Sequence, residues 1–175
     1  AASALFSHFR PRGKRLAIIT NGGGPGVMAA DHAADIDIPL AQLSTATMTK
    51  LGELLPPTWS RSNPIDILGN ADPERYRIAL QACIDDDGVD GVLAILTPQA
   101  MTDPLAVAKA IIEVADKLNR SLICCWMGED QVREARQLLE DSGIPAFRMP
   151  ETAIELFHHI SKYYRNQKLL LQTPE

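Results

Sequence analysis

The chain has 175 residues, of which 46% are hydrophobic and 22% charged, and its formal net charge is −5. This is ordinary globular composition for about one domain, and the acidic balance excludes a basic footprint for nucleic acid or an anionic membrane. No run of 18 apolar residues predicts a membrane-spanning helix, and the first apolar run, 1–6, is too short for a signal peptide. Three cysteines, two of them adjacent, suit a reducing compartment, so we expect a cytoplasmic protein.

The hydrophobic pattern predicts strands that alternate with helices. Strands are expected over 16–20, 40–43, 65–68, 92–96, 122–126 and 146–148. Helices are expected over 1–10, 27–35, 45–55, 72–86, from 103, over 129–142, and from 150 to at least 163. Such alternation requires right-handed βαβ crossovers, so the sequence predicts a flavodoxin-like three-layer α/β sandwich with a mainly parallel sheet of five to six strands. We expect 1–13 to be a lead-in helix or linker, 14–164 the folded domain, and 165–175 a connector.

The loop after the first expected strand, Asn-Gly-Gly-Gly-Pro-Gly at 21–26, carries most of the chemical information. Parallel sheets bind ligands beyond the carboxyl ends of their strands, and glycines let the backbone approach a ligand closely. With Pro25 as the first helical residue, the N–H groups of Gly26, Val27 and Met28 would point outward at the positive end of a helix. The loop therefore predicts a phosphate site formed by Asn21, Gly22, Gly23, Gly24, Pro25, Gly26 and Val27.

Other uses of the same loop are less well supported. A Walker loop requires a Lys after its last glycine, and none follows Gly26. The segment 24–29 matches the dinucleotide pattern GxGxxA, which also requires an acid after the second strand, and Gln42, Leu43 and Ser44 stand at that point. A purely structural role for the glycines remains an alternative.

Residues from neighbouring loops are candidates to support the phosphate site: Asn63, Asp66, Thr97 and Gln99. For Asn63 and Asp66, positioning a ligand and satisfying backbone groups are equally open alternatives. We assign no catalytic residue and no metal site.

Two adjacent pairs of reactive side chains are expected to be structural. His158 and His159 are adjacent on a helix and point about 100° apart, so they cannot chelate one ion together. Cys124 and Cys125 lie in a strand and face opposite sides of it, as small core residues.

Four segments together resemble the NDP-forming acyl-CoA synthetases, the superfamily of succinyl-CoA synthetase. They are LAIITNGGGPGVMAAD (16–31), LPPTWSRSNPIDILGNADPERY (55–76), TPQAMTDP (97–104) and LLEDSGIPAFRMPETAIELF (138–157). The resemblance covers nearly all of 14–164 and implies the flavodoxin-like ligase domain of that superfamily. Several ordered motifs at matching separations make it more specific than the glycine loop alone.

The resemblance implies a multidomain reaction in which acyl-CoA, phosphate and ADP or GDP are converted to acid, CoA and ATP or GTP. A phosphohistidine on another ligase domain carries the phosphoryl group between the N-termini of two helices, and the helix after the glycine loop is one of them. None of the four histidines of this chain lies in a matching motif. The domain alone would bind no cofactor, whereas the parent enzyme would use CoA, ATP or ADP, and Mg²⁺.

The partners implied are the CoA-binding, second ligase and ATP-grasp domains or subunits of the parent. Two other functions remain open. A similar domain occurs in large protein lysine acetyltransferases that carry a GNAT-type domain, where it would have a regulatory, acyl-CoA-sensing role. A free-standing nucleotide-binding protein is the second alternative, and self-association of the domain is also left open.

Overall fold

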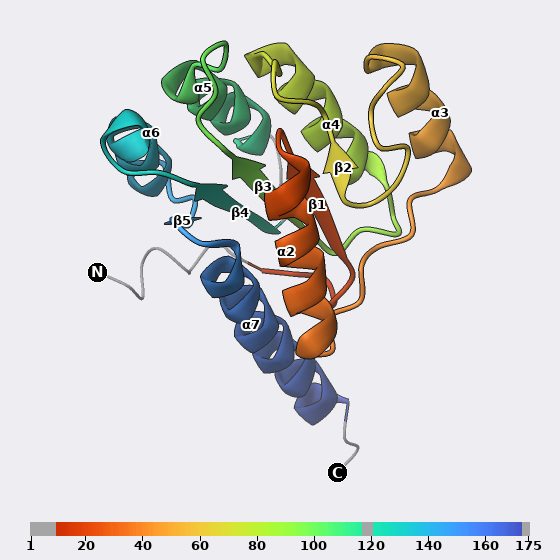
Figure 1. Cartoon of the computed structure of the whole chain (residues 1–175). Helices are drawn as coiled ribbons and strands as arrows, with labels where there is room; N and C mark the ends of the chain where they lie inside the picture. Colours follow the sequence, from red (N-terminus) through yellow and green to blue (C-terminus); the bar gives the residue numbers. More distant parts are fainter. Residues whose placement is uncertain (1–9, 117–120, 173–175) are drawn as a thin grey trace.

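The computed structural model describes residues 10–116 and 121–172, and within them the chain forms a three-layer sandwich (Figure 1). The central sheet is entirely parallel, with the strand order β2-β1-β3-β4-β5. Its strands are β1 (Leu16–Thr20), β2 (Ile65–Asp66), β3 (Gly91–Leu96), β4 (Ser121–Trp126) and β5 (Ala146–Phe147). This order is the flavodoxin-like one, so the expected fold class is confirmed.

Helices cover both faces of the sheet. One face carries α3 (Thr45–Leu54), α4 (Pro73–Asp85), α5 (Pro104–Ala115) and α6 (Asp130–Asp141), and the other carries α2 (Gly23–Asp35) and α7 (Pro150–Leu171). The expected start signals act as caps, because Asp72 accepts a hydrogen bond from the N–H of Arg75 and Asp103 accepts from Leu105 and Ala106.

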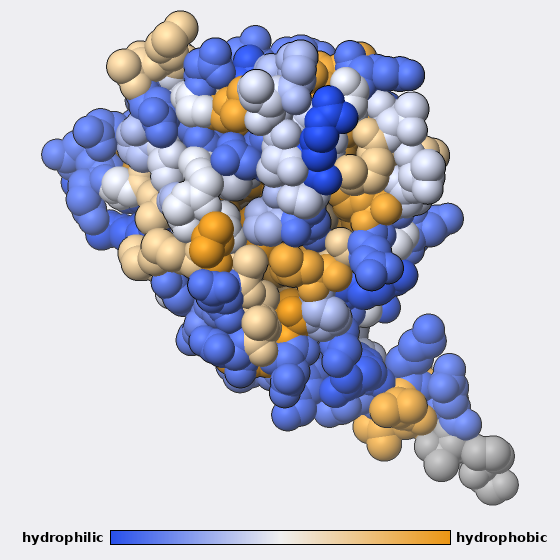
Figure 2. Space-filling view, turned by 45° about the vertical axis from the view of Figure 1, so that its right-hand side comes forward, coloured by the Kyte–Doolittle hydropathy of each residue, from blue (hydrophilic) through white to orange (hydrophobic). Residues whose placement is uncertain are grey.

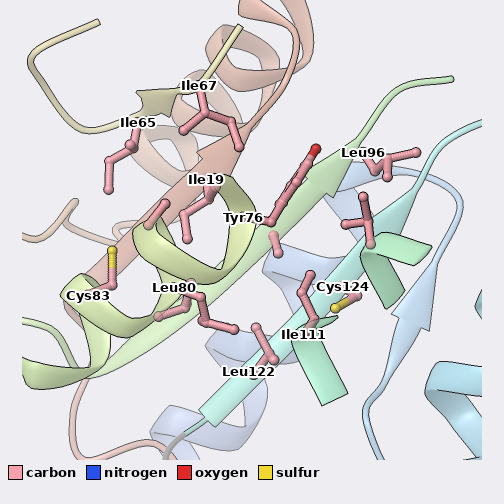
Figure 3. Close-up of a cluster of buried hydrophobic side chains, with 14 of the residues drawn as sticks. Ile19, Ile65, Ile67, Tyr76, Leu80, Cys83, Leu96, Ile111, Leu122 and Cys124 are labelled. Atoms are coloured by element: carbon pink, nitrogen blue, oxygen red, sulfur yellow. The ribbon is translucent and has the colours of Figure 1, made fainter. Parts of the chain in front are cut away.

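The core is divided by the sheet into two clusters. Alternate residues of β1 point to opposite faces, so that Ile19 packs in the larger cluster, shown in Figure 3, and Ile18 packs in the smaller one. Cys124 and Cys125 follow the same alternation, as expected, and both are fully buried. Burial raises the pKa of Cys125 to about 12.

The expected strand at 40–43 was wrong. Only Leu40 bridges β1, at Leu16, and the pairing stops there. The side chain of Asn63 explains the stop, because its Oδ1 accepts the N–H of Ile18 at 3.0 Å and its amide donates to the carbonyls of Leu16 and Ala41 at 2.9 and 3.0 Å. One side chain thus uses the hydrogen bonds that a longer strand would have made.

Other boundaries differ in length. β2 and β5 are shorter than the patterns at 65–68 and 146–148 indicated, and each has two residues. α7 continues to Leu171, so the expected boundary at 164 falls inside a helix. The expected lead-in helix at 1–10 lies almost entirely outside the described residues.

Candidate functional site at the carboxyl edge of the sheet

The glycine loop is mostly helical, which corrects the expected helix start at Pro25 or Val27. α2 begins at Gly23 with Gly22 as its N-cap, and the N–H of Gly26 already donates to the carbonyl of Gly22 at 3.3 Å. Pro25 is the third helical residue, where its missing N–H removes no helical bond. The outward N–H groups are therefore those of Gly23 and Gly24, not those of Gly26, Val27 and Met28.

Asn21 holds the start of the loop against the end of β3. Its Oδ1 accepts from the N–H and the hydroxyl of Thr97 at 2.7 and 2.9 Å, and its Nδ2 donates to the Thr97 carbonyl at 2.9 Å. Asn21 is 1% exposed and all of these bonds are intramolecular, so its side chain fixes the backbone. β1 and β3 diverge into connections on opposite faces here, which is where open α/β sheets bind ligands.

The glycines of the loop have different neighbours. A Cβ on Gly26 would lie 2.9 Å from Cγ2 of Thr20, and one on Gly22 would lie 3.0 Å from Oγ1 of Thr97. A Cβ on Gly24 would have no atom within 4 Å. Packing within the domain therefore explains Gly26 and Gly22, whereas Gly24 is open to an approaching molecule.

Asp66 and Gln99 lie on the loops beside α2. The Asp66 Oδ1 accepts the N–H of Leu68 at 2.9 Å, and its Oδ2 lies 3.3 Å from the Cβ position of Gly23. The Gln99 side chain is exposed and packs over Gly69, with Oε1 3.2 Å from that Cβ position. Asp66 thus places a carboxylate at the positive end of α2, while Asn63, whose side chain serves the backbone of β1, is not part of this edge.

Sequence reasoning missed Arg136, a 6% exposed cation at the same edge. Its Nη1 donates to the carbonyls of Trp126 and Gly128 at 2.9 and 2.7 Å, which fixes the turn after β4. The sequence contained a sign of its burial, because Arg136 lies on the apolar face of α6, beside Val132, Ala135 and Leu139.

Beside the start of α2, the described residues offer the backbone N–H groups of Gly23 and Gly24 and the carboxylate of Asp66. Within residues 10–116 and 121–172, no three His, Cys, Asp or Glu side chains come together as metal ligands. None of the helices in these residues has the length and hydrophobicity to span a membrane. His32, on α2, lies away from the edge; it is half-buried against α7, with Nε2 3.5 Å from the Glu155 carboxylate.

The family profile described as the Ligase-CoA domain matches residues 16–170. The chain belongs to the Ligase-CoA domain family. This Ligase-CoA domain is 41% identical over 159 residues to acetate–CoA ligase [ADP-forming] I of Archaeoglobus fulgidus, covering 91% of this chain and 22% of that protein. It is 44% identical over 152 residues to acetate–CoA ligase [ADP-forming] of Methanocaldococcus jannaschii, covering 85% of this chain and 22% of the relative.

Solved structures agree with the Ligase-CoA assignment. The dinucleotide-forming acetyl-coenzyme A synthetase 1 of Ca. Korarchaeum cryptofilum, in complex with phosphate and ADP, is similar with a TM-score of 0.88 and 28% identity. That match covers 99% of this chain and 38% of the other. The chain therefore spans about a fifth to two-fifths of the length of these proteins.

Proposed function

We propose that this domain supplies one helix N-terminus of the phosphoryl-transfer site of an ADP-forming acyl-CoA synthetase. The proposal rests on the N–H groups of Gly23 and Gly24, which are exposed and point outward at the start of α2. The space around Gly24 is open, so a ligand can approach them. α2 has thirteen residues, and its aligned peptide dipoles favour an anion at this end.

No histidine of residues 10–116 and 121–172 lies at this edge, so the phosphoryl carrier would come from another ligase domain. The two N–H groups would bind phosphoryl oxygens, and Asn21 would hold the loop that aims them. Asp66 can accept a hydrogen bond from the ring N–H of an incoming imidazole, which fixes the orientation of the ring. The negative charge of Asp66 also makes a free phosphate dianion bind more weakly here than a phosphate carried on a cationic or N–H-bearing group.

In the parent enzyme, acyl-CoA and phosphate would give acyl phosphate and CoA, and the phosphoryl group would pass through histidine to ADP. The relatives are named ADP-forming acetate–CoA ligases, which supports CoA and ADP or ATP as the parent's ligands. Mg²⁺ would be held on the nucleotide-binding part rather than at this edge. The CoA-binding, second ligase and ATP-grasp units are the proposed partners, in the cytoplasm.

The position of Asp66 at the end of β2 also favours a second candidate function, dinucleotide binding. Because 40–43 is not a strand, the second strand of the sheet is β2, and it ends in the acid that the GxGxxA pattern requires. However, this carboxylate lies against Gly23 at the phosphate position, rather than at the distance of a ribose. Phosphoryl binding is therefore the better-supported function.

The test is a titration of the ¹⁵N-labelled chain with inorganic phosphate and, separately, with NAD. We expect phosphate to shift the amide signals of Gly23 and Gly24, and Gly24→Asp to abolish the shift by adding a like charge. Ala34→Asp, which adds the same charge to an exposed position near the other end of α2, is the matched control and should keep the response. Saturable NAD binding that outcompetes phosphate at Gly23 would replace this function with the dinucleotide one.

A further inference from the structure

A pocket lies at the opposite edge of the sheet from the glycine loop, where the strands begin. Its volume is about 730 Å³, and it is bounded by 11–14, which lead into β1, by 37–38, and by the second half of α7. α7 starts at the carboxyl edge after β5 and runs back across the smaller cluster, so its end reaches the edge where the strands begin (Figure 1). The volume is typical of a small-molecule site.

The pocket concentrates positive charge in an acidic chain. It is lined by five cationic side chains and one carboxylate, Asp37; the cations are Arg12, Lys14, Lys162, Arg165 and Lys168. Of these five cations, only Arg12 forms an ion pair with another described residue, with its Nη1 3.7 Å from Oδ1 of Asp87. Figure 2 shows the projecting end of α7 as hydrophilic surface, with hydrophobic side chains beside the grey C-terminal atoms.

Two groups on the pocket wall, the buried Ser161 and the partly exposed His158, also reflect this environment. Ser161 lines the pocket at 6% exposure, and its hydroxyl has no hydrogen-bond partner in the described structure. One turn earlier, burial and then the charges of His159 and Lys162 hold the pKa of His158 below its ordinary value.

We propose that this pocket binds an organic phosphate of about nucleotide size. Lys162, Arg165 and Lys14 would contact the phosphate oxygens, since a guanidinium and two ammonium groups around one cavity suit a polyphosphate. Ile38 and Tyr164 line the same pocket and provide an apolar wall for a ring. The inference is independent of the proposed function, because the two sites share no residue and lie at opposite edges of the sheet.

The test uses the 175-residue chain, with ADP and inorganic pyrophosphate as probes in calorimetric titrations at two salt concentrations. Lys162 and Arg165 are exposed, so the double variant K162Q/R165Q should fold normally. We expect it to bind ADP at least about tenfold more weakly, because each lost charge-assisted contact is worth about a factor of ten.

The matched control is K109Q/R133Q, which removes two cations lining a different groove between α5 and α6. It should change ADP affinity less than about twofold. In the ¹⁵N-labelled Gly24→Asp variant, ADP should still shift the amide signals of Lys162 and Arg165, which separates this site from the glycine loop. Equal losses in K162Q/R165Q and K109Q/R133Q would overturn the proposal in favour of non-specific attraction. Failure of both probes to bind at low salt would overturn it as well, and equal affinity for ADP and pyrophosphate would overturn the role of the apolar wall.

Discussion

Replacing Gly26 or Gly24 by alanine tests two different roles of glycine within one turn of α2. Gly26 is required for packing against β1, whereas Gly24 leaves space for a ligand. The Cβ added at Gly26 would lie 2.9 Å from Cγ2 of Thr20, roughly 0.6 Å closer than the short end of normal carbon contacts. Thr20 cannot readily turn away, because its hydroxyl donates to the carbonyl of Gly22 and accepts the Gly22 N–H. The helix must therefore move away from β1, at an overpacking cost of about 1–3 kcal/mol.

The Gly24→Ala variant carries the same helix-propensity gain, up to about 1 kcal/mol, without the contact. The difference in unfolding free energy between the two variants consequently isolates the overpacking, at about 1–3 kcal/mol. For a domain of this size that corresponds to a difference of about 2–12 °C in Tm. Urea unfolding can be followed by the fluorescence of the two buried tryptophans, Trp59 and Trp126.

Two results would refute this reasoning. Equal stability of the two variants would mean that α2 is not held against Thr20 as described. A Gly24→Ala variant less stable than the parent chain would mean that Gly24 is required by packing, which would remove the main argument for ligand access there. Gly24→Ala should instead weaken phosphate binding while leaving stability unchanged or slightly increased.

Three further predictions concern the scaffold. Asn63→Ala should lower the unfolding free energy by about 2–4 kcal/mol and speed hydrogen exchange of the Ile18 amide, because backbone groups lose their partners. Burial alone would raise the pKa of Asp90, but hydrogen bonds from Arg15 outweigh it and lower the pKa. The stabilising contribution of this pair is therefore complete above the unfolded pKa of about 3.9 and is lost as pH falls through the lower folded value, so Asp90→Asn should destabilise the chain at pH 7 and much less at pH 2 in urea titrations. All three cysteines, Cys125 included, should resist a thiol reagent at pH 8 in the folded chain and react in urea, and rapid labelling without urea would contradict their burial.

The order of elements and the site edge were accessible from the sequence because they depend on local signals. Apolar runs mark β1, β3 and β4, and the acids before Pro73 and Pro104 mark helix starts that the structure confirms. Proline was misleading at position 25, because its fixed φ is compatible with the third helical position as well as the first. The helix start consequently moved by two residues, and with it the set of outward N–H groups.

The errors that remain come from contacts between distant segments. The pattern at 40–43 predicts a strand, but the side chain of Asn63, 22 residues later, donates a hydrogen bond to the carbonyl of Ala41. Local sequence patterns cannot predict an interaction between such distant residues. The role of Asp66 depends on β2 lying next to β1, which follows only from the sheet order. The basic pocket combines residues from both ends of the described chain, and periodicity within one helix cannot reveal such a combination.

The lengths of the outer strands affect how the domain behaves in concentrated solution. β2 and β5 form the two rims of the sheet, and each offers only two residues to a strand from another molecule. Each is also preceded by a proline, Pro64 or Pro145, which has no N–H to donate. Unpaired rims are the usual template for edge-to-edge aggregation. Because both outer strands are short and follow a proline, they protect the hydrophobic central strands from pairing with another molecule.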